Sequence, residues 1–244
     1  MDRMIYVAMA GAKMNMQRQD VLSNNLANVS TTGFRAELQA TRAVPVRGDG
    51  ASTRVYSLET TVGYDESAGP IAFTGRAMDV AMSGKSWMAV QGLDGTEAYT
   101  RAGSLTVNTE GNLATQGGLT VLGDGGPIAV PANAEPSIAA DGTVSAKQAS
   151  GKITTLGKLK MVTPETKLTR GEDGLFRSSD GTDLPADTTA RLQDGALEGS
   201  NVNPIETMVA MIAAARQFES QMKMMQTAES DEKSAVQLLS GSGG

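Results

Sequence analysis

The chain has 244 residues and a formal charge of −6, with 28 glycines, 14 methionines, one tryptophan, four tyrosines and four phenylalanines. It contains no histidine and no cysteine, which excludes imidazole and thiolate groups as catalysts or metal ligands. Lysines and arginines are scattered rather than gathered in a basic tract, so we expect no nucleic acid partner. Because aromatic residues are few, we expect an aliphatic and methionine core without a large aromatic cluster.

Residues 3–27 have the spacing of a helix. Apolar residues recur at steps of three and four, interrupted by Asn15 and Gln19, and no proline occurs. Such a helix is poorly stable alone and needs a partner. The turn-forming run Ser-Thr-Thr-Gly at 30–33 should end it near Asn28. The start of the chain is only briefly apolar and lacks a basic leader, so we expect no cleaved signal peptide and no membrane-embedded segment.

The middle of the chain, about 34–200, loses the helical spacing and favours antiparallel β structure. Short β-forming runs alternate with Asp-Gly and other glycine turns, which suit the positive φ angles of hairpins. Small-residue loops are expected at 48–53 and 132–136. The runs that we expect to form strands are 54–60, 87–91, 105–108, 119–122 and 158–162.

The helical spacing returns after Asn201. Asn203 suits a helix cap, Pro204 suits the first helical position, and Glu206 suits the acidic position of a capping box. A helix from Pro204 to Leu239 would be roughly 54 Å long, more than the β region could cover. The pattern therefore predicts packing against other molecules. The apolar residues that follow the spacing of a coiled-coil seam are Ile205, Met208, Ile212, Ala215, Phe218, Met222 and Met225.

Motifs for chemistry are weak in this sequence. Gly84-Lys85-Ser86 ends like a phosphate-binding loop, but Asp79 stands where the first glycine belongs. Residues 230–233 have the Ser-x-x-Lys spacing of penicillin-binding enzymes without a Lys-Thr-Gly block, and a solvated helix face explains them better. Asp173 with Asp180 or Asp183 suits hairpin turns better than a calcium loop, and the methionines suit packing better than a soft-metal site. We therefore expect no enzyme, catalytic residue, cofactor, metal or small-molecule substrate.

Four separated blocks resemble the signatures of the flagellar axial family, which comprises rod, hook and hook-associated proteins. Residues 24–35 read Asn-Asn-Leu-Ala-Asn-Val-Ser-Thr-Thr-Gly-Phe-Arg, and residues 74–81 read Thr-Gly-Arg-Ala-Met-Asp-Val-Ala. Residues 99–105 with 110–113 form the third block, and 197–204 with Arg-Gln-Phe-Glu at 216–219 form the fourth. The opening nine residues and the modest length resemble proximal rod proteins. Distal rod proteins are the close alternative, with a different usual opening and a somewhat longer chain.

The resemblance implies a function. Members of this family pair their N- and C-terminal helices in an inner layer and stack helically, with copies of themselves and with other rod subunits, into a hollow shaft. They are exported through the flagellar type III apparatus without a cleaved signal, and the rod lies in the periplasm and transmits torque from motor to hook. A different class remains open from the residues alone, namely a secreted β-domain binding module with a coiled-coil oligomerisation tail.

We therefore expect a mixed α and β fold, with long terminal helices in a coiled-coil layer and a mainly antiparallel β middle domain. The expected divisions are an N-terminal helix and turn at 1–35, an extended linker or arm at 36–75, a β domain at 76–200, and a C-terminal helix with a flexible tail at 201–244. The helices should order only on assembly. The residues expected to form the assembly interface are Leu22, Leu26, Asn28, Gly33, Phe34, Ile205, Met208, Ile212, Phe218 and Met222.

Overall fold

The structure is a computed structural model that describes residues 2–45 and 55–241, so the loop expected at 48–53 lies outside the described residues. The chain divides into two compact units, which are described separately. Unit 1 comprises 1–27, 37–63 and 203–244, and unit 2 comprises 28–36 and 64–202.

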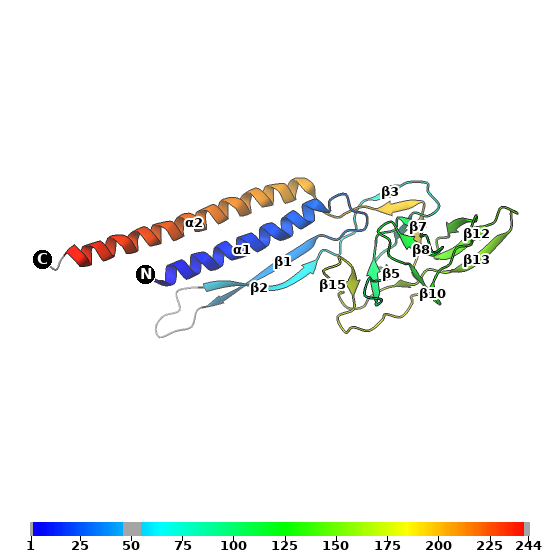
Figure 1. Cartoon of the computed structure of the whole chain (residues 1–244), viewed down its shortest axis with the longest axis horizontal. Coiled ribbons are helices and arrows are strands. Elements are labelled where there is room, and N and C mark those ends of the chain that lie inside the picture. Colours follow the sequence, from blue (N-terminus) through cyan, green and yellow to red (C-terminus); the bar gives the residue numbers. More distant parts are fainter. Residues whose placement is uncertain (1, 46–54, 242–244) are drawn as a thin grey trace. The chain divides into compact units, whose positions relative to one another are not determined.

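Unit 1 is a pair of helices with a two-stranded sheet. Helices α1 (Asp2–Ala27) and α2 (Pro204–Gly241) lie side by side in opposite directions, and the strands β1 (Glu37–Pro45) and β2 (Val55–Tyr64) pair with each other (Figure 1). The two predicted helices are thus confirmed. The start of α2 follows from local chemistry, because the Asn203 side-chain oxygen accepts hydrogen bonds from the amides of Ile205 and Glu206, at 3.1 and 3.3 Å.

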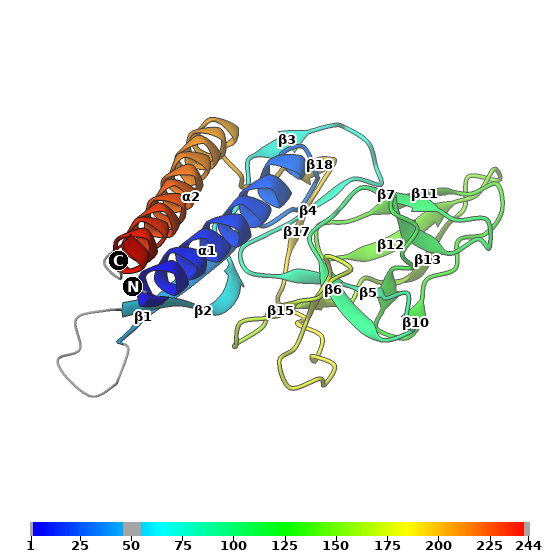
Figure 2. The same ribbon diagram turned by 60° about the vertical axis from the view of Figure 1, so that its left-hand side comes forward.

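Unit 2 is built from short antiparallel strands, as the sequence predicted. Its largest sheet has five strands in the order β14-β5-β6-β16-β15, a second has the order β11-β12-β13, and the rest are two-stranded. Figure 2 shows the strands β11, β12 and β13 of the second sheet side by side. The bounds are β3 Ile71–Phe73, β4 Val80–Met82, β5 Trp87–Gln91, β6 Glu97–Thr100, β7 Leu105–Val107, β8 Leu113–Thr115, β9 Leu122–Gly123, β10 Gly126–Pro127, β11 Glu135–Ile138, β12 Thr143–Lys147, β13 Ile153–Lys158, β14 Met161–Val162, β15 Thr169–Arg170, β16 Phe176–Arg177, β17 Leu192–Asp194 and β18 Ala196–Glu198.

Two of the predicted strands were placed imperfectly. The run 158–162 divides between β13 and β14, because the chain passes from the three-stranded to the five-stranded sheet at this point. In the run 119–122 only Leu122 belongs to a strand, and Thr120 and Val121 make isolated bridges. The loop expected at 132–136 ends earlier, since β11 begins at Glu135.

The expectation that aromatic residues form no large cluster was wrong. Unit 2 has an aliphatic and methionine core that includes Leu113, and beside it a second core that holds four of the nine aromatic residues. These four are Tyr64, Trp87, Tyr99 and Phe176. The ring centroid of Phe176 lies 4.8 Å from that of Tyr64 and 4.6 Å from that of Trp87. Composition gave no sign of this cluster, because its members are far apart in the sequence.

Candidate assembly interface

The interior of unit 1 is lined by small side chains. Ala8 and Ala12 on α1 and Ala214 on α2 are buried, and so are the polar Asn15 and Thr207. Small residues at a helix–helix contact allow the two backbones to approach closely.

One close contact between the two helices lies at Gly11 of α1. A Cβ atom added there would come within 3.1 Å of the Gln221 side chain on α2. Such a distance is tight, so a larger residue at position 11 would require the end of the Gln221 side chain to shift.

The large apolar side chains of α2 lie outside. The side chain of Ile205 is 74% exposed, and those of Met208, Val209 and Ile212 are at least half exposed. At 3.6 residues per turn, these four residues fall on the side of α2 opposite to Thr207 and Ala214. We call them the outer apolar face. Single exposed apolar side chains are common on soluble proteins, but a contiguous group of them indicates a surface for another molecule.

The residues predicted for the interface divide into three groups. Ile205, Met208, Ile212 and Met222 are exposed, whereas Leu22, Leu26 and Phe218 are half-buried in unit 1. Asn28, Gly33 and Phe34 lie in unit 2, in the turn that follows α1 in the chain. The predicted seam of α2 therefore does not coincide with the side of the helix that the chain itself buries. Its role in contacts between subunits remains a prediction.

The turn at 28–36 requires glycine at position 33. Gly33 has a φ of 69°, and a Cβ there would lie 2.2 Å from the carbonyl carbon of Arg101. Phe34 beside it is buried, and the guanidinium of Arg170 lies 4.4 Å from the centre of its ring. The turn is therefore anchored in unit 2 by a backbone fit and by an aromatic contact.

A buried ion cluster joins distant parts of unit 2. The Glu198 carboxylate accepts from Arg35 Nη2 at 2.7 Å and from Arg101 Nε at 2.6 Å, and all three side chains are nearly inaccessible to solvent. We call these residues the junction cluster. Arg101 also donates to the carbonyl oxygens of Met82, Gly84 and Ser86. One carboxylate therefore holds both the segment that follows α1 and the segment that precedes α2.

The buried charges of the cluster act on one another. Two buried guanidinium groups share one carboxylate, and burial together with the nearby charge of Arg101 lowers the pKa of Arg35, against the opposing effect of Glu198. Removal of the carboxylate would leave two buried positive charges without their partner.

Asn201 reinforces the same junction with side-chain hydrogen bonds. Its oxygen accepts from the Ala36 amide at 2.6 Å, and its nitrogen donates to the carbonyl oxygens of Asp65 and Ser67 at 3.1 and 3.0 Å. One amide side chain thus ties together three chain segments of unit 2. In unit 1, Asn25 acts in a similar way, because its side chain both donates to and accepts from the backbone of Glu37.

The second signature block forms its own local network. Asp79 is buried, accepts from Thr74 Oγ1 at 2.7 Å, and forms an ion pair with Arg76. Arg76 also donates to Ser104 Oγ at 2.8 Å, which connects this block to the third one. The charged residues of the second block therefore link short strands that share few backbone hydrogen bonds with one another.

Sequence reasoning did not identify Arg35, Arg101 and Glu198 as functional residues. In the sequence these three residues were noted only as parts of the signature blocks. The sequence did hold an indication of this cluster. Each of the three is a charged residue within a run of small and apolar residues, and a charged side chain in such a run is either exposed or paired with an opposite charge. Which charges pair was not visible, because Arg101 and Glu198 are 97 residues apart.

Comparison with known proteins agrees with these signatures. The family model described as "Flagella basal body rod protein" matches residues 5–35, that of the FlgE/F/G D1 domain of flagellar hook protein matches 81–146, and that of the C-terminal part of the basal-body rod FlgEFG protein matches 193–238. The flagellar basal-body rod protein FlgF of Salmonella typhimurium is 45% identical over 250 residues, covering 98% of this chain and 99% of its own length. The chain belongs to the flagellar basal-body rod protein family.

Other relatives of this rod protein include both types considered above. FlgF of Escherichia coli is 46% identical over 98% of the chain and 99% of its own length. The rod protein FlgG of Bacillus subtilis is 32% identical over 93% of the chain and 95% of its own length. The resemblance to rod proteins of the FlgF type, inferred from the opening residues and the length, is confirmed. Within residues 2–45 and 55–241, neither helix has a stretch apolar enough to cross a membrane.

Proposed function

We propose that this chain is a structural subunit of the proximal flagellar rod and assembles helically, with copies of itself and with other rod subunits, through α1 and α2. The shaft so formed transmits torque from motor to hook. The single observation that carries the mode of assembly is the outer apolar face, where Ile205, Met208, Val209 and Ile212 are exposed. The likeness to FlgF proteins supports the proximal position.

In this proposal the inner layer of the shaft is a coiled coil made by residues 1–35 and 201–244. Residues 36–75 act as an arm and 76–200 as the outer β domain. The exposed members of the predicted interface on α2 meet other subunits, and the seam within one chain is left to small residues such as Ala12 and Ala214. A helix whose large apolar residues are uncovered gains most of its stability when a neighbour covers them, so ordering is coupled to assembly.

The proposal includes the route to the site of assembly. The chain is carried by the flagellar type III export apparatus without removal of a signal peptide, and it is incorporated in the periplasm. Incomplete ordering of the helices before assembly would keep the chain narrow enough for an export channel and would limit premature polymerisation.

Deletion of residues 204–244 tests the proposal in cells that lack the native copy. We expect the truncated protein to be absent from isolated basal bodies and the cells to be non-motile. A matched control shortens the exposed turn at 148–151 between β12 and β13 and should leave incorporation unchanged. Incorporation of the truncated chain at the normal level would overturn the proposal. Recovery of the full-length chain only in the distal part of the rod would overturn the proximal assignment.

A further inference from the structure

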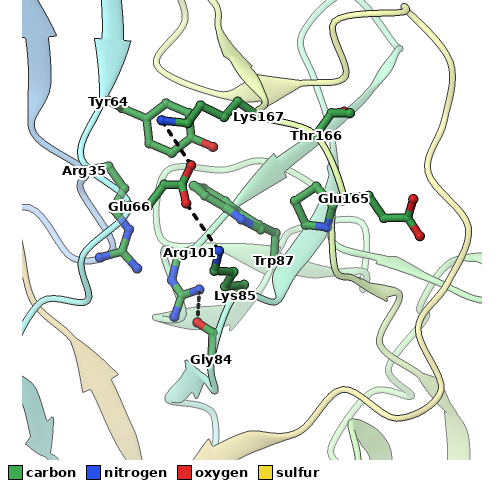
Figure 3. Close-up of a pocket in the computed structure, with 11 residues that line it drawn as sticks. Arg35, Tyr64, Glu66, Gly84, Lys85, Trp87, Arg101, Glu165, Thr166 and Lys167 are labelled. Atoms are coloured by element: carbon green, nitrogen blue, oxygen red, sulfur yellow. Dashed lines mark hydrogen bonds and ion pairs between the residues drawn. The ribbon is translucent and has the colours of Figure 1, made fainter.

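The pocket beside the junction cluster carries balanced charges. It has a volume of about 220 Å³ and lies in unit 2, where the Glu66 carboxylate stands between the ammonium groups of Lys85 and Lys167 (Figure 3). Charge therefore selects no occupant for this pocket, whereas the exposed apolar side chains of unit 1 form a more distinctive surface. The balanced groups are the basic Arg35, Lys85, Arg101 and Lys167 and the acidic Asp65, Glu66, Glu165 and Glu198.

Helix α1 exposes a group of large apolar side chains of its own. Tyr6, Met9 and Met16 are each a little more than half exposed, while Ala8 is buried. At 3.6 residues per turn, the three exposed residues fall on one side of the helix, away from the buried alanine. Lys13 is exposed on the same side, and its aliphatic stem extends the apolar surface. We call Tyr6, Met9 and Met16 the α1 apolar face.

The α1 apolar face and the outer apolar face of α2 lie at different levels of the pair of helices. The two helices run in opposite directions, and Gly11, in the middle of the α1 apolar face, lies beside the Gln221 side chain (Figure 1). The middle of the outer apolar face is near Met208, 13 residues before Gln221. At a rise of 1.5 Å per residue, the two faces are about 20 Å apart along the pair. One chain therefore cannot cover either face with the other.

We propose that the outer apolar face of one copy packs on the α1 apolar face of a second copy, with a shift of about 20 Å along the helices. This inference rests on the proposed function, in which copies meet in the shaft. Because the two faces are different surfaces of the same chain, the contact is head-to-tail, and each copy uses one face toward one neighbour and the other face toward the next. A head-to-tail contact with an axial shift at each step suits growth along a shaft.

Charges beside the two faces support this register. Lys13 lies within the α1 apolar face, and Glu206 lies next to Ile205 at the start of the outer apolar face, and both are exposed. When the middles of the two faces meet and the helices run in opposite directions, Lys13 comes opposite Glu206. A pair of opposite charges beside an apolar contact favours one register over its alternatives.

Disulfide cross-linking in isolated basal bodies tests the register, because the chain has no cysteine of its own. With Lys13 opposite Glu206, Met9 falls beside Val209 of the second copy. Within one chain these two residues are about 20 Å apart along the helices, beyond the roughly 4 to 7 Å between Cα atoms that a disulfide spans. Met9→Cys with Val209→Cys should therefore cross-link only between copies, and mild oxidation should give dimers, trimers and larger products.

The matched control places the second cysteine on α2 at the level of Met9 without an axial shift. Met9→Cys with Lys223→Cys uses an exposed position, and it should give no more cross-linked product than Met9→Cys alone. Efficient cross-linking of this control in place of the Val209 variant would overturn the shift. Dimers without larger products would overturn the head-to-tail arrangement. Cross-links exclusively to a different protein would overturn the assignment of a second copy.

Charge reversal provides a second test of the register. Lys13→Glu and Glu206→Lys each place like charges at the contact and should lower incorporation into basal bodies about threefold, whereas the double variant should restore it. Lys13→Arg keeps the charge and serves as the control, with normal incorporation. The unfolding midpoint of unit 2, followed through Trp87, should be unchanged in all four variants. A double variant that is incorporated no better than either single variant would contradict the pairing.

The outcomes separate this inference from the proposed function. If the Val209 variant is incorporated into rods but gives no cross-link between copies, the contact between the two faces is wrong and the proposed function stands. If the unaltered full-length chain is missing from isolated basal bodies, the proposed function itself fails.

Discussion

Unit 2 and unit 1 differ in where their large apolar side chains lie. In unit 2 the fully buried side chains include Leu105, Leu113 and Met161, and charged groups such as Glu198 are paired inside. Among the described side chains of unit 1, alanines are buried on α1 and α2, and Ile205 is largely exposed. Burial of apolar area is the main source of folding free energy, at roughly 25 cal/mol per Å². Unit 2 therefore has its own core, whereas large apolar side chains of α2 in unit 1 stay exposed.

The largest effect that would test this comparison is expected at Glu198. Replacement by alanine in Glu198→Ala leaves two buried guanidinium groups unpaired, and we expect the free energy of unfolding of unit 2 to fall by about 3 to 5 kcal/mol. Urea unfolding followed through Trp87 measures it. The control Asp194→Ala removes an exposed carboxylate from the adjacent strand and should change the value by less than about 0.5 kcal/mol. A loss below about 1 kcal/mol for Glu198→Ala would show that the cluster does not hold the junction.

The next effect compares one core residue from unit 2 with one outer residue from unit 1. Leu113 is fully buried, so Leu113→Ala should lower the free energy of unfolding by about 2 to 5 kcal/mol. Ile212 is 56% exposed, and Ile212→Ala should change it by less than about 0.5 kcal/mol in the isolated chain. Thermal and urea unfolding of both variants measure the difference. Similar losses for the two would mean that the outer apolar face is already covered within one chain.

A smaller effect is expected at the cap of α2. Asn203→Ala removes the acceptor of two amide hydrogen bonds and should cost about 1 kcal/mol of helix stability. This loss of helix stability is measured in assembled rods as faster amide hydrogen exchange at Ile205 and Glu206. Asn203→Asp keeps an acceptor and serves as the control, with exchange close to that of the unaltered chain. Equal exchange in Asn203→Ala would mean that the cap does not set the start of the helix.

The smallest effect is a dependence on pH in unit 2. Hydrogen bonds to Asp187 from the hydroxyl of Thr189, at 2.6 Å, and from that of Thr163, at 2.7 Å, lower its pKa to about 2. A carboxyl whose pKa is lower in the folded state adds stability above its unfolded pKa of about 3.9, and that stability is lost as the pH falls toward 2. Asp187→Asn should flatten this part of the pH profile, measured as the unfolding midpoint between pH 2 and 5. An unchanged profile would show that these bonds do not favour the ionised form.

The sequence predicted the elements of the fold where local chemistry decides them. The cap at Asn203, the positive φ of Gly33 and the β-forming run 87–91 before a glycine turn are local features, so their positions could be read directly. The two helices and the antiparallel character of the middle were predicted for the same reason. The predicted strand boundaries were wrong where one β-forming run contributes to two sheets, as at 158–162. Only tertiary contacts decide where such a run is divided.

The face of α2 that the chain itself covers could not be predicted from spacing. Two stripes at steps of three and four run along this helix, one through Ile205, Met208 and Ile212 and the other through Thr207 and Ala214. Spacing and hydrophobicity favour the first, but α1 presents small residues, so the second lies inside. The junction cluster was missed because its partners lie far apart in the sequence, with most of the β strands of unit 2 between Arg35 and Glu198.

The central claim is that the outer apolar face of α2 serves assembly rather than folding. Its most direct test is the triple variant Ile205→Gln, Met208→Gln and Ile212→Gln, assayed for incorporation into isolated basal bodies, with Gln217→Ala at an exposed position of the same helix as control. We predict that unfolding followed by Trp87 is unchanged and that the triple variant is absent from basal bodies, while the control is incorporated normally. Incorporation of the triple variant at the level of the unaltered chain would contradict the account.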